Sequence, residues 1–215
     1  MSGYRILGRA SSSNVQAAMW GAAELGLEVV REDCGETFSK LDTPAFRALN
    51  PHGKIPVLVL ANGRSIFETP AILRFLADAH GSDAFWPKDP VERAQVDMWA
   101  EWAKHDVAEA FTGPVFWRVV RTPATRHDQA AIRAAVDFLE QQLAIAEPRL
   151  AEGNLCGDAL TLADIQYGHI LFRYFDIEIP RADLPNLRRY YETLTSRPAY
   201  RAHVMRRYDE LRDTI

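Results

Sequence analysis

The sequence is poor in cysteine and has no long apolar run. Its 215 residues include two cysteines, Cys34 and Cys156, which are too few for a disulfide framework. No stretch approaches the roughly 20 apolar residues that a membrane-spanning helix needs, and the first residues lack the apolar segment of a secretory signal. These absences argue against a secreted protein and against a membrane partner, and they predict a cytoplasmic location.

An excess of positive charge is also missing. The formal net charge is -4; basic and acidic residues balance over residues 1–80, so the remainder carries the whole excess. A nucleic-acid-binding domain is usually strongly basic, so we expect no nucleic-acid partner. No spacing of ligating side chains indicates a metal, and no glycine-rich loop indicates a phosphate site.

The first 80 residues alternate between strand and helix patterns. Apolar residues at helical spacing follow Asn14, and the pair Asn62-Gly63 between two apolar runs predicts a hairpin. Thr43-Pro44 and Thr69-Pro70 each place a capping residue before a proline that is suited to the first turn of a helix. The predicted order is β-α-β-α-β-β-α, with the first two strands at residues 4–8 and 27–31.

The rest of the chain has the pattern of a helical domain. Residues 81–90 have the composition of a linker. We therefore expect an α/β domain over residues 1–80 and an all-helical domain over 91–215. The first predicted helix of this domain begins near residue 91 and is interrupted at Gly113-Pro114, and the next spans 128–151. Another helix begins with a capping box at Thr161 and Asp164 and ends at about 175. The last two helices are bracketed by Asn186 and Arg197-Pro198.

Four segments in this order resemble the cytosolic glutathione transferases. They are Ser12-x-Asn14, NPHGKIPVL at 50–58, FETPAILRFLA at 67–77 and GDALTLADI at 157–165. The stretch GRASSSNVQ followed by ELGL is most similar to bacterial serine-type members near the theta and nu groups. The resemblance implies a thioredoxin-like first domain, glutathione as co-substrate without a metal, and a homodimer.

The resemblance implies Ser12 as the catalytic residue. A thiol is a nucleophile when it is ionised, and a hydroxyl donor at the positive end of a helix stabilises a thiolate. Ser12 stands where the first strand meets the first helix, so it can supply both. Ser11 to Ser13 also suit a turn and a helix cap, and Ser11 remains an alternative for the thiol contact.

The same resemblance implies the residues that hold glutathione. Lys54 would approach a peptide carboxylate, the backbone of Ile55 would pair with the cysteinyl unit beside a cis Pro56, and Glu68 with Thr69 would close the site. The sequence departs from the family pattern here, because Glu-Thr-Pro replaces the more frequent Glu-Ser followed by a small or polar residue. The set that we expect to bind glutathione is Asn14, Lys54, Ile55, Pro56, Glu68 and Thr69.

The second substrate is expected between the domains. In this interpretation it is a hydrophobic electrophile, and the residues selected for its wall are Arg9, Ala10, Trp102 and Asp106. The candidates on the helix of the wall are Trp99, Trp102, His105, Asp106, Phe111, Phe116 and Trp117. Trp99 and Trp102 are three residues apart and share a helix face, a pattern that is also typical of a core.

The leading hypothesis is a detoxifying transferase that joins the glutathione thiolate to an electrophile. Peroxide reduction or dehalogenation on the same site is an alternative, and so is a binding protein that keeps the fold without turnover. Neither cysteine matches a catalytic position of the cysteine-type relatives. The retained Ser12, Lys54, Glu68 and Thr69 favour an enzyme.

Overall fold

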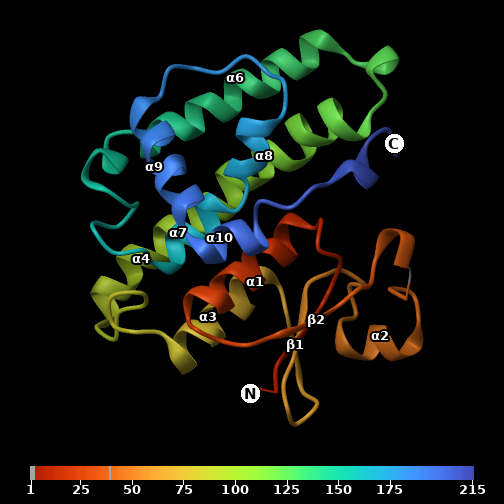
Figure 1. The fold of residues 1–215 in the computed structure, drawn as a ribbon, viewed down its shortest axis with the longest axis vertical. Helices are drawn as coiled ribbons and strands as arrows, with labels where there is room; N and C mark the ends of the chain where they lie inside the picture. The colour runs from red at the N-terminus through yellow and green to blue at the C-terminus, as the bar shows by residue number, and fades with distance from the viewer. Residues whose placement is uncertain (1–2, 39) are drawn as a thin grey trace.

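The structure is a computed structural model that describes residues 3–38 and 40–215. Elements up to His80 form an α/β part, which is red to yellow in Figure 1, and elements from Pro90 onward form a helical part in green to blue. The predicted fold class, a thioredoxin-like part followed by helices, is confirmed.

The α/β part contains one four-stranded sheet. Its order is β2-β1-β3-β4, with β1 parallel to β2 and antiparallel to β3, which is in turn antiparallel to β4. The elements are β1 (Arg5–Leu7), α1 (Ser13–Glu24), β2 (Val30–Glu32), α2 (Pro44–Leu49), β3 (Val57–Val59), β4 (Ser65–Phe67) and α3 (Thr69–His80).

Alternating side chains divide the core of this part between the two faces of the sheet. Ile6 and Leu58 pack with residues of α1 and α3 on one face. Leu7, Val57 and Val59 pack with a residue of α2 on the other. Because successive side chains of a strand point to opposite faces, helices can cover both faces of this short sheet.

The predicted hairpin joins β3 to β4. The Gly63 N–H donates to the Leu60 carbonyl at 2.9 Å, and the Arg64 N–H donates to the Asn62 side chain at 3.1 Å. Gly63 has a φ of 82°, a conformation that glycine adopts without steric cost. Local turn chemistry therefore determines this connection.

The second strand begins later than predicted. We expected it at 27–31, whereas β2 is Val30–Glu32. The chain leaves α1 through Gly26, whose φ is 70°, and the Leu27 N–H still donates to the Ala22 carbonyl at 3.0 Å. The first residues after Gly26 are thus used to close the helix before pairing with β1 can start.

The helical part follows a connection that contains Trp86. Its α-helices are α4 (Pro90–Trp102), α5 (Glu109–Phe111), α6 (Gln129–Ala146), α7 (Leu162–Gly168), α8 (Leu171–Asp176), α9 (Pro185–Ser196) and α10 (Pro198–His203), and two π-helical segments, Ala103–Ala108 and Thr112–Arg121, continue α4. Short 3-10 turns lie at Glu36–Phe38, Ala124–Arg126, Arg149–Glu152 and Asp209–Leu211.

The expected interruption at Gly113-Pro114 is wrong. Helical backbone runs through these residues as a π-helical segment that ends at Arg121. Proline removes one backbone donor and crowds the preceding turn, and a wider π-helical turn tolerates both effects. The long first helix can therefore extend along the whole cleft between the two parts.

Two further helix ends differ from the prediction. The helix expected over 128–151 ends at Ala146, just before Pro148, and the helix expected to reach residue 175 is divided after Gly168. A Cβ at Gly168 would lie 2.7 Å from the Leu194 side chain, and the Gly168 carbonyl accepts a hydrogen bond from Tyr200 at 3.0 Å. Close packing accounts for the break between α7 and α8.

The predicted capping box starts α7. The buried Asp164 carboxylate accepts from the Thr161 N–H at 2.8 Å, the Leu155 N–H at 3.0 Å and the Tyr190 hydroxyl at 3.0 Å. Burial raises the pKa of Asp164, while these hydrogen bonds act in the opposite direction. The carboxylate thus ties the start of α7 to the preceding loop and to α9.

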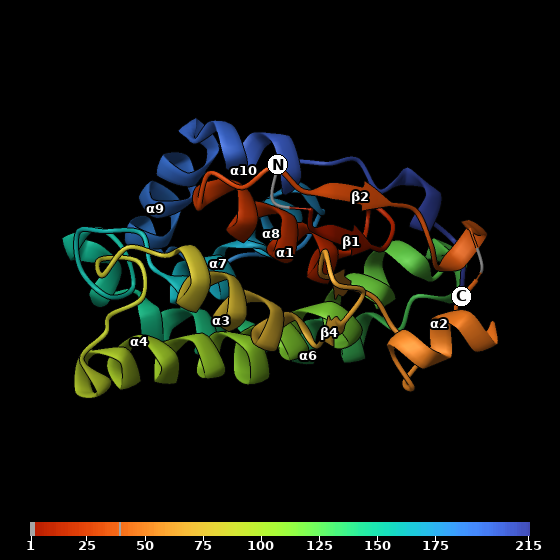
Figure 2. The ribbon, with the colours of Figure 1, turned by 90° about the horizontal axis from the view of Figure 1, so that it is seen from below.

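Helices α1 and α3 join the two parts. They cover the sheet on one side and contact α7 on the other, and α1 also meets α10 (Figures 1 and 2). The buried Trp20 ring of α1 packs edge-on against Tyr200, with centroids 4.9 Å apart. Trp20 and Arg197 both donate to Glu24, at 2.8 Å and 2.5 Å.

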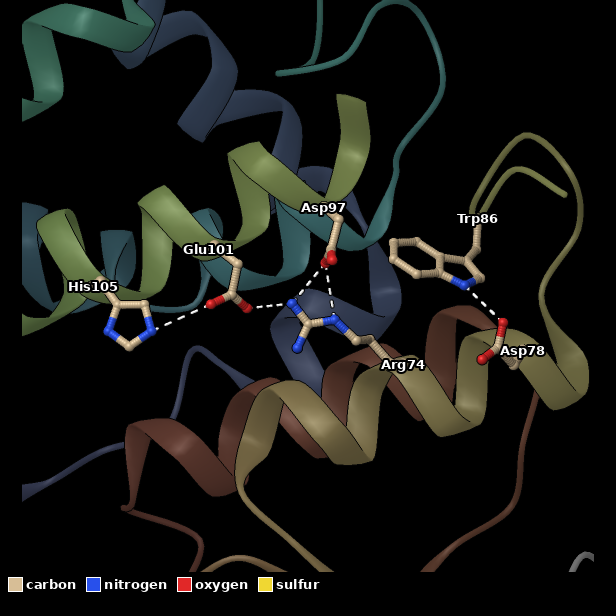
Figure 3. Close-up of polar contacts among 6 residues, drawn as sticks. All are labelled: Arg74, Asp78, Trp86, Asp97, Glu101 and His105. Carbon is tan, nitrogen blue, oxygen red and sulfur yellow. Dashed lines mark hydrogen bonds and ion pairs between the residues drawn. The ribbon is translucent and has the colours of Figure 1, made fainter. Parts of the chain in front are cut away.

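A polar network also links α3 to α4. Figure 3 shows Arg74 of α3 directed at Asp97 and Glu101 of α4, with His105 on the far side of Glu101. The Arg74–Asp97 distance is 2.6 Å. These contacts fix α4, and the π-helical segments that continue it, against the α/β part.

Candidate active site

Ser12 lies between the loop after β1 and the first turn of α1. It is the N-cap residue, with φ -79° and ψ 122°, and its carbonyl accepts from the Gln16 N–H at 2.9 Å. Its hydroxyl makes no capping hydrogen bond with the part of the chain that the structure describes. The half-buried hydroxyl can therefore donate to a group placed at the positive end of the helix.

Ser11 differs from Ser12 in access. The Ser11 residue is 2% exposed, and its hydroxyl has no hydrogen-bond partner among the described residues. Its carbonyl accepts from Arg173 of α8. Both serines line the same cavity, so geometry favours Ser12 as the thiol donor by its greater exposure and keeps Ser11 as the alternative.

The loop before β3 forms one wall of the site. The Lys54 side chain is exposed, and the Lys54 carbonyl accepts from the Asn50 side chain at 2.8 Å. The Ile55–Pro56 peptide bond is cis, as the resemblance implies. Ile55 packs on both apolar clusters of the sheet and also lines the cavity.

Glu68 and Thr69 lie at the start of α3, outside the lining of this cavity. Thr69 is 3% exposed, whereas Glu68 is exposed and has a φ of 66°. A positive φ at a residue other than glycine costs on the order of 1–3 kcal/mol and is frequent at ligand sites. The strained backbone conformation thus lies at the N-cap of α3, where the Glu68 side chain makes no capping hydrogen bond with the described residues.

A lysine from the helical part contacts one of the residues that the resemblance implies for glutathione binding. Lys104 Nζ donates to Asn14 Oδ1 at 3.0 Å across the two parts. Burial lowers the pKa of Lys104, and the nearby carboxylates of Glu109 and Glu68 oppose that effect. Lys104 thus lies near both Asn14 and Glu68, and the sequence alone did not single it out.

A cavity of about 300 Å³ lies between the α/β part and the helical part. Both parts contribute side chains to it, so it can bring a ligand of one part against residues of the other. Its lining is Arg9, Ser11, Ser12, Ser13, Asn14, Glu36, Leu41, Gly53, Lys54, Ile55, Thr112, Phe116, Trp117, Arg121, Arg173 and Leu211.

Three of the four residues selected for the second-substrate wall lie outside the lining of this cavity. Trp102 does not line this cavity but stacks on the buried Tyr167, with ring centroids 5.7 Å apart. Asp106 is exposed and also lies outside the lining, whereas Arg9 lines it and Ala10 lines neighbouring hollows. The aromatic stripe that includes Trp102 therefore belongs to the core.

Residues further along the same helix line the cavity. They are Thr112, Phe116 and Trp117. A π-helical turn holds more residues than an α-helical turn, so the segments Ala103–Ala108 and Thr112–Arg121 change which positions face the cavity. Phe116 and Trp117 belong to the helix that the sequence predicted as a wall, whereas Thr112 was not singled out.

Two arginines share one carboxylate at the cavity. Arg9 and Arg121 lie 3.4 Å and 3.3 Å from the same oxygen of Glu36. Their side chains are 15% and 12% exposed, whereas that of Glu36 is 39% exposed. Arg121 also donates to Thr214 at 3.0 Å and lies 5.3 Å from the Trp117 ring centroid. Burial lowers the pKa of Arg9, and its Nε has no hydrogen-bond partner within the described residues.

Arg173 is the most deeply buried cation of the site. The residue is 3% exposed and donates to the Ser11 carbonyl. Its guanidinium lies 4.7 Å from the Phe116 ring centroid and 5.3 Å from that of Tyr208. Burial lowers the pKa of Arg173 to about 10, with a further lowering by Arg9, so it stays protonated at neutral pH.

The arginines were missed by the sequence reasoning, apart from Arg9. The one local signal for Arg173 is a charge inside the apolar segment LFRYF. The sequence predicted an interruption of the helix at Gly113-Pro114, before Arg121. Arg121 reaches the cavity because the helix continues through these residues in π-helical form.

Neither cysteine is suited to act as a nucleophile. Burial raises the pKa of Cys34 and raises that of Cys156 to about 11. A thiol with a raised pKa holds little thiolate at neutral pH. Neither cysteine lines the cavity, so thiol chemistry at this site requires an external thiol.

Residues 3–38 and 40–215 contain no cluster of three or more His, Cys, Asp or Glu that could hold a metal ion. None of their helices combines the length and the apolar character needed to span a membrane.

Comparisons with known proteins agree with this geometry. The family description "Glutathione S-transferase, N-terminal domain" matches residues 11–79, and "Glutathione S-transferase, C-terminal domain" matches residues 122–193. Glutathione S-transferase GstB of Escherichia coli K12 is 32% identical over 93% of this chain and 97% of its own length.

Structural comparison gives the same result. A theta class glutathione S-transferase from Xanthomonas axonopodis pv. citri, solved with glutathione bound, superposes with a TM-score of 0.89. It is 38% identical, over 96% of this chain and 99% of that one. A probable elongation factor 1-gamma of Arabidopsis thaliana is 27% identical over 74% of this chain and 38% of its own length, so relatives also include parts of larger proteins. The chain belongs to the glutathione S-transferase family.

Proposed function

We propose that this protein transfers the thiolate of glutathione to an electrophilic small molecule. One observation carries the proposal. The Ser12 side chain makes no capping hydrogen bond with the described residues at the N-terminus of α1, and Ser12 lines the cavity between the two parts. In the reaction a sulfur–carbon bond forms, the leaving group departs with its electron pair, and the thiol proton passes to solvent.

The residues around Ser12 offer a place for each end of glutathione. Lys54 would pair with the glycine carboxylate, and the Ile55 backbone would hold the cysteinyl unit. Glu68 would pair with the γ-glutamyl ammonium, while the hydroxyl and N–H groups at Thr69 would bind its carboxylate. Support comes from the Xanthomonas relative, whose structure contains glutathione.

Lys104 and Asn14 add a link across the cleft. Because Lys104 donates to Asn14 and lies near Glu68, the helical part would hold the first turn of α1 in place. We propose that this contact keeps the Ser12 hydroxyl aligned with the bound sulfur.

The assembly and location are part of the same proposal. A cytoplasmic homodimer would use the outer faces of α3 and α4, where Val91 and Met98 are 65% and 49% exposed. The proposed domains are residues 1–80 and 91–215, joined by 81–90. No metal takes part in the proposed reaction.

A screen of electrophiles tests the proposal. We expect retention on immobilised glutathione, followed by conjugates of chlorinated aromatics or epoxides that mass spectrometry can detect. S-methylglutathione, which carries no free thiol, serves as a competitor and should inhibit. If hydroperoxides are reduced with formation of glutathione disulfide and no electrophile is conjugated, the peroxidase alternative is favoured. If glutathione binds but no substrate reacts, the binding-protein alternative is favoured.

A further inference from the structure

We propose that the electrophile is an anion whose negative group is bound by Arg9, Arg121 and Arg173. This inference rests on the proposed transferase function and specifies its second substrate. It replaces the expectation of a purely hydrophobic molecule.

The charge of the cavity differs from that of the chain. Arg9, Lys54, Arg121 and Arg173 line the cavity with a single carboxylate, that of Glu36, although the whole chain is acidic. Glu210, outside the lining, acts on two of the arginines at longer range. The cationic excess is thus confined to the site and leaves room for an incoming negative charge.

Arg173 is the strongest single indication of an anion-binding site. Within the described residues no carboxylate lies at ion-pair distance from its guanidinium, and its Nε has no hydrogen-bond partner there. A buried charge without a counter-ion is costly to folding. A carboxylate brought by a ligand would offset that cost through charge-assisted hydrogen bonds.

Arg9 and Arg121 share one counter-ion. Both lie against one oxygen of the half-exposed Glu36, Arg121 also donates to Thr214, and the Nε of Arg9 has no partner among the described residues. Arginine forms paired hydrogen bonds to a carboxylate when its donors are available. A ligand carboxylate could therefore join these two guanidinium groups beside Arg173.

Two of the three arginines come from a different part of the chain than the proposed glutathione contacts, whereas Arg9 follows β1 in the α/β part. Lys54 and Ile55 come from the loop before β3, whereas Arg121 and Arg173 come from the helical part, beside Phe116 and Trp117. The aromatic rings next to the guanidinium groups suit a flat substrate that carries an acidic group. An aromatic carboxylate with a displaceable halogen combines these properties.

A matched pair of electrophiles isolates the charge. The probes are a chloronitrobenzoate, with chlorine para to the carboxylate and ortho to the nitro group, and the corresponding chloronitrobenzamide. In both, the glutathione sulfur attacks the ring carbon, the C–S bond forms and chloride leaves with the C–Cl electron pair. Each kcat/KM is divided by the uncatalysed rate with glutathione, which removes the difference in intrinsic reactivity.

The wild-type protein should prefer the benzoate by about tenfold or more, because hydrogen bonds to a charged group are about twice as strong as those to a neutral one. Arg121→Gln should remove most of this preference through its effect on the benzoate. Arg118→Gln is the matched control, because Arg118 lies on the same π-helical segment but outside the lining, and it should keep the preference.

Equilibrium binding provides a second readout that needs no turnover. Calorimetry with the two glutathione conjugates should show tighter binding of the carboxylate form by wild type and not by Arg121→Gln. If the wild-type protein binds glutathione but shows equal corrected kcat/KM values for the benzoate and the benzamide and equal affinity for their conjugates, this inference is overturned and the transferase proposal stands. Absence of glutathione binding would show that the transferase proposal itself has failed. Equal slowing of both probes by Arg121→Gln, with a higher pKa of the bound thiol, would assign the arginines to the thiolate and also overturn the inference.

Discussion

Replacing Ser12 with alanine removes one hydroxyl and leaves its structural surroundings intact. The Ser12 side chain makes no capping bond with the described residues, and the helix start is held by the backbone bond from the Gln16 N–H to the Ser12 carbonyl at 2.9 Å. We therefore expect the variant to fold with little loss of stability. Any change in rate then reports on chemistry.

The size of the effect follows from one hydrogen bond to a charged sulfur. Such a bond contributes on the order of 1.5–3 kcal/mol, which corresponds to a pKa change of about one to two units for the bound thiol. Free thiols of this kind have a pKa near ~8.5. At neutral pH, Ser12→Ala should therefore react roughly ten- to a hundredfold more slowly, with nearly unchanged glutathione affinity.

The pH–rate profile is the decisive assay. Loss of the donor raises the pKa of the bound thiol, so the rise in rate should move to higher pH, and the two proteins should approach each other in alkaline solution. Ser11→Ala and Cys34→Ala are the controls and should keep the wild-type profile, because Ser11 is 2% exposed and Cys34 lies outside the cavity lining.

Two results would refute this reasoning. If Ser11→Ala loses activity while Ser12→Ala keeps it, the donor is the neighbouring serine. If neither serine matters, another group stabilises the thiolate, with Arg9 and Asn14 the next candidates because both line the cavity.

Three other predictions concern stability and assembly. Asp164→Ala should lower the free energy of unfolding by about 3 kcal/mol or more in urea denaturation, because buried donors from Thr161 and Tyr190 lose their acceptor; an unchanged midpoint would contradict this. Burial holds the pKa of His169 at about 3, so below pH 6.5 the unfolded chain gains a proton that the native state excludes. Stability should then fall by about 1.4 kcal/mol per pH unit as pH decreases, and His169→Gln, which has no such proton, should show a smaller fall. Light scattering should give about twice the chain mass of 24.3 kDa, and a single species at the chain mass would contradict the proposed homodimer.

Local signals predicted the parts of the fold that depend on short-range chemistry. The Asn62-Gly63 turn, the Thr43 cap before Pro44 and the capping box at Thr161 lie where we expected them, because each depends on residues within about one turn. The expected cap at Thr69 is wrong, because Glu68 is the N-cap of α3 and Thr69 is its first helical residue. The start of β2 was misjudged because helix closure through Gly26 delays strand pairing.

Tertiary effects account for what the sequence could not predict. Gly113-Pro114 carries strong stop signals, but the helix continues in π-helical form and brings Trp117 and Arg121 to the cleft. Trp102 looked like a candidate wall residue, but stacking on Tyr167 places it in the core. Arg173 lies about 160 positions from the serine loop, and only the packing of α8 brings its guanidinium to Ser11.

Binding of glutathione and ionisation of its thiol at this site can be observed together. The measurement is a spectrophotometric pH titration of thiolate absorbance for glutathione bound to the wild-type protein. We expect a pKa about one to two units below the free value of ~8.5. Failure to bind glutathione at millimolar concentration, or a bound thiol that titrates like the free one, would contradict this expectation.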